Sequence, residues 1–130
     1  MLDHLVVDGY NVLHAWHRGK GRAAIDDARV ALIRELESAA ALRGIHCTVV
    51  FDGTPIVDLL HASSLHLDVL FAGPTQSADS LIERAVHDHR ERSGVAVVTD
   101  DRAQGNMVLG WGARCWSSRQ LAEWLTEVND

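Results

Sequence analysis

Aspartates recur where apolar runs of the chain end. Asp8 closes the run "LVVD" and Asp52 closes "TVVFD", while Asp100 and Asp101 directly follow "VAVVT". Asp79 lies in the first turn of a predicted helix that follows another apolar run. Mg²⁺ and Mn²⁺ take carboxylate oxygens as ligands, and an ion held in this way activates water and neutralises the charge of a phosphodiester under in-line attack. The pattern therefore indicates metal-dependent hydrolysis of a phosphodiester.

Each of these acids also has a structural interpretation. Asp8 and Asp52 precede glycines, so either could start a turn. Asp79 could complement the dipole of its helix, and one member of the pair Asp100–Asp101 could cap the next helix while the other faces the metal. No cluster of histidines or thiols accompanies the acids, which disfavours zinc.

Segments with strand-like and helical patterns alternate along the chain, which predicts βαβ units with a parallel sheet. Strands are expected over residues 4–8, 46–52, part of 65–73, 95–101 and 113–116. Helices are expected over residues 24–44, 77–94, 102–109 and 117–128. Ser77 is the expected N-cap of the second of these helices, and Gly44 and Gly94 are expected to end the first two. Residues 53–64 are expected to be a loop with one helical turn.

The acids come from four separate segments of this predicted sheet. Ligands of an open parallel sheet bind outside the carboxyl ends of its strands. The acids should therefore converge at one edge, where their mutual repulsion would cost several kcal/mol without a cation among them.

Size and composition indicate one globular domain over residues 1–130, with 47% apolar and 23% charged residues. The net charge of −6 normally argues against a nucleic-acid partner, but Lys20 is the only lysine and the other basic residues are arginines, which suit phosphate. No apolar stretch approaches the ~20 residues of a membrane span. A cytoplasmic protein with reduced cysteines at positions 47 and 115 is therefore expected.

Candidate substrate contacts follow the first predicted strand. The segment "HAWHRGKGR" holds Trp16, Arg18, Lys20 and Arg22, and Arg102 follows the acidic pair. Trp16 could stack on a base or fold into the core, and the sequence leaves both open. The other three tryptophans, at positions 111, 116 and 124, are expected in the core or on the surface of a homodimer.

The blocks "VDGYNVLHAW", "VVFDG", "SADSLIERAV" and "VVTDDRAQ", followed by "WSSRQLAEWL", resemble the YacP-like NYN domain family of the wider PIN-like nuclease group. The resemblance runs from Leu5 to about Leu125, and the combination of the DGYN block with A-D-x-x-I-E is specific. It implies a PIN-like three-layer α/β/α sandwich and a Mg²⁺- or Mn²⁺-dependent endoribonuclease. RNA, and with it a ribosome-bound message, is the implied partner.

The same resemblance assigns roles by position. Asp8 and Asp79 would bind metal, with Asn11 orienting water or phosphate beside Asp8. Asp101 stands at the aspartate of the family's T-x-D block and would complete the metal set, while Asp52 and Asp100 would assist. The chain departs from the family between residues 53 and 68, a short stretch without arginine or lysine.

Two alternatives from other classes remain open. A non-catalytic module that binds RNA or the ribosome fits the low basic content, although it leaves the acids unexplained. A phospho-receiver domain fits the length and the βα alternation. Receivers need a carboxylate pair after the first strand and a lysine after the fifth, and the chain has neither.

Overall fold

The computed structural model describes residues 1–52 and 63–129. Its five strands form one sheet with the order β3-β2-β1-β4-β5, in which every neighbouring pair is parallel. The strands are β1 (His4–Asp8), β2 (His46–Asp52), β3 (Leu67–Ala72), β4 (Val95–Val98) and β5 (Arg114–Trp116). Except for Ser63 and Ser64, the predicted loop over 53–64 lies outside the described residues.

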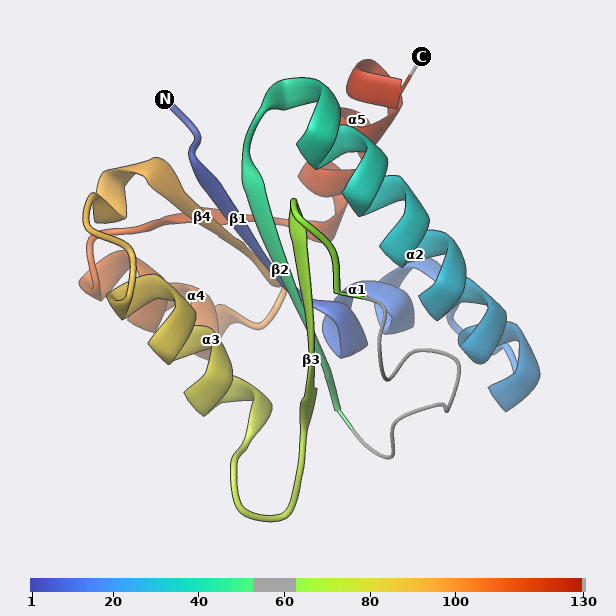
Figure 1. Cartoon of the computed structure of the whole chain (residues 1–130). Coiled ribbons are helices and arrows are strands. Elements are labelled where there is room, and N and C mark those ends of the chain that lie inside the picture. The colour runs from blue at the N-terminus through green and yellow to red at the C-terminus, as the bar shows by residue number, and fades with distance from the viewer. Residues whose placement is uncertain (53–62, 130) are drawn as a thin grey trace.

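Helices cover both faces of the sheet (Figure 1). The helices are α1 (Gly9–Trp16), α2 (Arg22–Arg43), α3 (Ala78–His87), α4 (Arg102–Gly110) and α5 (Ser118–Asn129). α1, α2 and α5 lie on one face, and α3 and α4 lie on the other. This arrangement confirms the predicted three-layer α/β/α sandwich.

Strand β1 supplies side chains to two separate cores because successive strand residues point to opposite faces. Leu5 and Val7 pack with the core under α1, α2 and α5. Val6 packs with the core under α3 and α4. All three are fully buried, which explains the continuous apolar run of this central strand.

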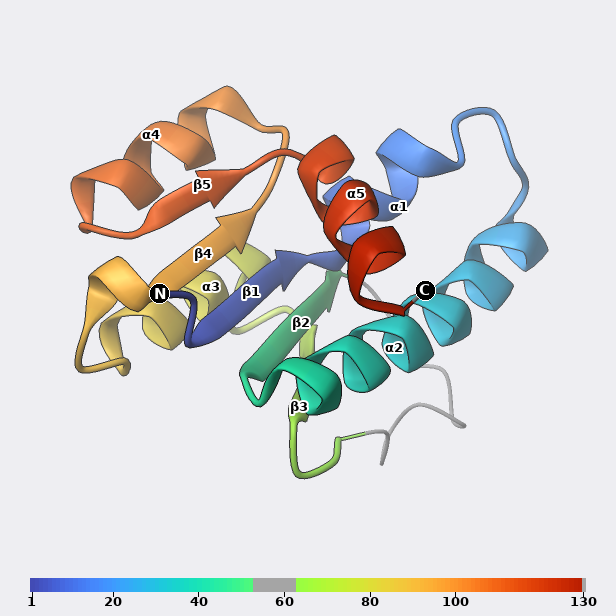
Figure 2. The same ribbon diagram turned by 90° about the horizontal axis from the view of Figure 1, so that it is seen from above.

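The strand order reverses between β1 and β4, the point at which open α/β sheets bind their ligands. β1 and β4 run in register from His4 opposite Val95 to Val7 opposite Val98. Asp8 therefore emerges beside the connection that leads from β4 to α4. Viewed from above, these two strands lie at the centre of the sheet (Figure 2).

Ser77 caps α3 as predicted, because its side chain accepts a hydrogen bond from the Ser80 N–H. The predicted ends of helix α3 and strand β4, in contrast, lie too far along the chain. The helix ends at His87 rather than Gly94, since its last buried residue is Val86 and the polar run that follows has no apolar face to pack. Strand β4 ends at Val98 rather than at position 101, so the acidic pair lies in the connection to α4.

Helix α1 was not predicted, although Asp8 caps it and its buried Val12 and Leu13 anchor it to the sheet. Helix α2 begins at Arg22, two residues earlier than predicted, and ends as predicted at Gly44, whose φ of 65° suits glycine.

Both cysteines are free, and burial raises the pKa of the Cys47 and Cys115 thiols. Among the described residues, no helix combines the length and the apolar character that crossing a bilayer requires.

Candidate functional site

Asp8 ends β1 and caps α1. Its Oδ1 accepts a hydrogen bond from the Asn11 backbone N–H at 3.2 Å. Gly9 follows because a Cβ there would lie 2.6 Å from the Phe51 ring. Burial, with the negative charges of nearby acids adding to it, raises the pKa of Asp8 to about 6, and the bond from Asn11 opposes this rise.

The acids that act on Asp8 in this way are Asp79, Asp101 and Asp52. They come from α3, from the connection after β4 and from the end of β2. The segments thus meet at the carboxyl edge as predicted, and the negative charges of three acids act on the Asp8 carboxylate there.

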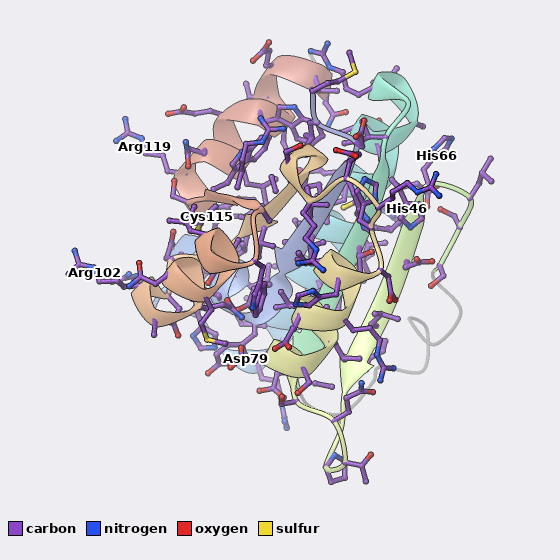
Figure 3. All side chains as sticks on the ribbon, turned by 90° about the vertical axis from the view of Figure 1, so that its left-hand side faces the viewer. His46, His66, Asp79, Arg102, Cys115 and Arg119 are labelled. Atoms are coloured by element: carbon purple, nitrogen blue, oxygen red, sulfur yellow. The ribbon has the colours of Figure 1, made fainter. Side chains whose placement is uncertain are left out.

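Asp79 lies in the first turn of α3, and Figure 3 shows it far from His46 and His66, which lie toward the other end of the strands. Its Oδ1 accepts a hydrogen bond from Gln104 Nε2 at 2.7 Å. This bond crosses from α3 to α4 and orients the carboxylate. The sequence did not draw attention to Gln104.

The acidic pair caps two different helices. Asp101 Oδ1 accepts hydrogen bonds from the Ala103 N–H at 2.9 Å and the Gln104 N–H at 3.2 Å, so Asp101 caps α4. Asp100 faces α5 instead, where its two oxygens accept from the Ser118 N–H at 2.8 Å and the Ser118 hydroxyl at 2.5 Å. Both oxygens of Asp100 are therefore engaged away from Asp8.

Asn11 links α1 to the connection after β4. Its Oδ1 accepts a hydrogen bond from the Asp100 backbone N–H at 2.7 Å. Beside it, the Asp101 N–H donates to Thr99 Oγ1 at 3.1 Å, so Thr99 and Asn11 hold the acidic connection in place. The amide Nδ2 of Asn11 is the part of this side chain that would act on water or phosphate.

Asp52 is exposed at the end of β2. Arg29 approaches its backbone oxygen at 3.5 Å and places its guanidinium 5.6 Å from the centre of the Phe51 ring. Arg29 therefore supports the end of β2.

Among residues 1–52 and 63–129, no three His, Cys, Asp or Glu side chains lie close enough together to hold an ion as they stand. Asp8, Asp79 and Asp101 each use one oxygen in a bond within the protein. Like charges without a cation also repel one another. The donor set nevertheless fits Mg²⁺ or Mn²⁺ in kind, because it consists of hard carboxylate oxygens, and burial together with the neighbouring negative charges raises the pKa of Asp8. Side-chain rotation would be needed to close the set around an ion.

The predicted substrate contacts divide into two groups. Arg18, Lys20, Arg22 and Arg102 are exposed, and Figure 3 shows Arg102 extending outward from α4. Trp16 is half-buried against the core under α5, where its Nε1 donates to the Ser118 carbonyl at 3.3 Å. It also lines an open pocket of about 450 Å³, whose other lining residues belong to α2 and α5. Of the two alternatives for Trp16, the structure therefore supports packing against the core over stacking on a base.

An exposed aromatic pair, missed in the sequence, lies on α1, the helix that Asp8 caps. Tyr10 is 51% exposed, and its ring centre lies 4.1 Å from that of the exposed His14. Helical side chains lean toward the N-terminus of their helix, which here is the end capped by Asp8. The spacing of four residues in "YNVLH" was the available signal.

Three comparisons place the chain among known proteins. A family model described as the YacP-like NYN domain matches residues 5–130. The uncharacterized protein YacP of Bacillus subtilis is 30% identical over 124 residues, which cover 92% of this chain and 73% of that protein.

Two crystal structures of Rae1 (YacP) from Bacillus subtilis match the fold. The first has a TM-score of 0.81 at 26% identity and covers 98% of this chain and 76% of the other. The W164L mutant has a TM-score of 0.80 at 25% identity and covers 98% and 77%. NYN domains belong to a nuclease superfamily with the PIN-like fold. The chain belongs to the YacP-like NYN domain family.

Proposed function

We propose that the protein is a Mg²⁺- or Mn²⁺-dependent endoribonuclease. The observation that carries the proposal is that acids from three other segments, Asp79, Asp101 and Asp52, act electrostatically on Asp8 at the switch point of the sheet. Membership of a nuclease superfamily supports the same chemistry. Asp8, Asp79 and Asp101 would hold the metal, and Asp52 would add negative charge at the rim.

A divalent ion bound there would neutralise charge on the phosphodiester and activate the attacking water. The chain itself would position the reactants. Asn11 would donate from Nδ2 to water or phosphate while its Oδ1 keeps the connection after β4 in place. Asp100 would act through Ser118, by holding α5 against this connection.

Single-stranded RNA is the proposed substrate class. The supporting observation is the exposed pair of Tyr10 and His14 on the helix that Asp8 caps. Unpaired bases stack on aromatic rings, whereas paired bases are inaccessible to them. Arg18, Lys20, Arg22 and Arg102 are further candidates for phosphate contact. A ribosome-bound message remains one source of such RNA.

The test compares RNA cleavage in Mn²⁺ by the unaltered protein and by Asp8→Asn. The variant should lose cleavage and keep its fold, because asparagine still caps a helix. Asp88→Asn is the matched control, since Asp88 caps the opposite end of α3 from Asp79 and should be dispensable. Cleavage that persists in Asp8→Asn would exclude Asp8 from the reaction.

A non-catalytic RNA-binding module is the second candidate. The observation that favours it is that Asp8, Asp79 and Asp101 each bond within the protein and that the described residues contain no set of three side chains ready to hold a metal. Salt-dependent RNA binding without turnover in any divalent metal would select this function.

A further inference from the structure

Gln104 is a buried amide that contacts two of the proposed metal acids. The residue is only 6% exposed and lies in the first turn of α4. Its Nε2 donates to Asp79 Oδ1 at 2.7 Å, and its backbone N–H donates to Asp101 Oδ1 at 3.2 Å. One residue thus connects the acid of α3 to the acid that caps α4.

The other end of the Gln104 amide has no partner. Its Oε1 is buried without a hydrogen bond to any of the described residues. A buried acceptor left unsatisfied costs about 1–3 kcal/mol, which an apolar side chain of similar size would avoid. Turning the amide over would not help, because its carbonyl would then face the Asp79 carboxylate and both amide hydrogens would need other acceptors.

Glutamine has a combination of groups that this position requires. A leucine or methionine would fill the volume but leave Asp79 without its donor. A glutamate would place one more negative charge within hydrogen-bond distance of Asp79, where like charges repel. Only a neutral side chain with both a donor and an acceptor can orient the carboxylate and still accept a hydrogen from a ligand.

We propose that Gln104 is a positioning residue of the acid site: its amide N–H orients Asp79, and its unpartnered Oε1 would accept a hydrogen bond from a water molecule of the divalent ion once the acids have rotated to hold that ion. The inference rests on the proposed function. Mg²⁺ and Mn²⁺ sites built from a few carboxylates retain waters, whose hydrogens need acceptors. Residues beyond the ligands that orient them and bond these waters typically change metal affinity about 10–100-fold when replaced.

The experiment measures Mn²⁺ affinity by isothermal titration calorimetry on the full chain. Gln104→Leu should bind Mn²⁺ about 10–100-fold more weakly. Its melting temperature in EDTA should equal or exceed that of the unaltered protein, because the lost bond to Asp79 is offset by removal of the unsatisfied oxygen. Gln104→Met, an unbranched side chain of similar length, should behave in the same way and replaces the leucine variant if that variant does not fold.

Gln120→Leu is the matched control, with the opposite expected pattern. Gln120 Oε1 accepts from the Ser117 N–H at 2.7 Å while Ser117 Oγ accepts from the Gln120 N–H at 3.1 Å, a reciprocal cap of α5. Its replacement should lower the melting temperature and leave Mn²⁺ affinity unchanged.

Three results would overturn the inference. The first is equal Mn²⁺ affinity in Gln104→Leu and the unaltered protein, which leaves the proposed nuclease function intact. The second is a weaker affinity accompanied by a metal-free melting temperature as low as that of Gln120→Leu, which would make Gln104 a structural residue. The third is an unaltered protein that binds no Mn²⁺, which overturns the proposed function together with the inference.

Discussion

Replacing Asp8 by asparagine should make the metal-free protein more stable. The Asp8 carboxylate is ionised at neutral pH although its burial and the neighbouring acids favour the protonated form. Burial, with Asp79, Asp101 and Asp52 adding to it, raises the pKa of Asp8 from 3.8 to about 6. A rise of about two units corresponds to roughly 3 kcal/mol at most. Asp8 is partly exposed, so we expect a gain of about 1–2 kcal/mol in the free energy of unfolding, or about 4–8 °C in melting temperature.

The sign of this effect depends on pH. Because the folded pKa lies above the unfolded one, Asp8 destabilises the folded protein relative to asparagine only where the carboxylate is ionised. The gain of Asp8→Asn should therefore be absent below about pH 3.8, grow as the pH rises to about 6, and stay constant above that value.

In Mn²⁺ the unaltered protein should become more stable than Asp8→Asn, which reverses their order of stability in EDTA. An ion that binds only the folded state adds about 2.7 kcal/mol at about 100 times its dissociation constant. The unaltered protein should gain this stability, while Asp8→Asn should gain far less because it lacks one ligand.

Thermal melts of both proteins in EDTA and in Mn²⁺, across the pH range, provide the assay. Asp88→Asn serves again as the control and should not show the reversal in Mn²⁺. The reasoning would be refuted if Asp8→Asn were less stable than the unaltered protein in EDTA at about pH 8, or if its gain were the same at every pH.

Three further predictions concern other parts of the molecule. In the Asp8→Asn background, Tyr10→Leu should weaken binding of a single-stranded RNA oligonucleotide about fivefold or more in fluorescence anisotropy, whereas Tyr10→Phe should not. Equal binding by Asp8→Asn and by both of its Tyr10 variants would exclude stacking on Tyr10. Burial, together with nearby His46 and His89, lowers the pKa of His4 to about 4, so the unfolded chain takes up a proton at a higher pH than the folded protein does. His4→Gln should therefore reduce the loss of stability between about pH 7 and pH 4 by about 2 kcal/mol, measured by chemical denaturation. Ser118→Ala should cost about 1 kcal/mol, measured as a lower melting temperature, since it removes the hydroxyl that Asp100 accepts from; an unchanged melt would contradict this.

Local patterns predicted most of the fold. The apolar runs of β1 and β4 predicted buried parallel strands because both faces of these strands are covered, and Gly44 and Ser77 marked helix ends through their own backbone and side-chain chemistry. Helix α3 was predicted to be too long because a polar helix and a polar turn have similar sequence patterns. Helix α1 was missed because its eight residues hold only a short apolar stripe.

The acids at the carboxyl edge were identified from the sequence, but their individual roles were not. The T-x-D block favoured Asp101 over Asp100, and the structure shows both as helix caps that face different partners. Trp16 was considered both as a substrate contact and as a core residue, and Tyr10 was not considered, although Trp16 packs against the core and Tyr10 is exposed. Exposure of a residue on a short helix depends on which neighbouring helices cover it.

The sequence by itself determined that the chain alternates strands with helices and ends or follows its strands with carboxylates, because these features depend on side-chain periodicity and on residues adjacent in the chain. Only the tertiary structure decided that Gln104 bonds Asp79, that Asn11 holds the Asp100 backbone and that Asp100 faces Ser118. These contacts join segments far apart in sequence. Their geometry depends on how the helices pack on the sheet, which no local pattern encodes.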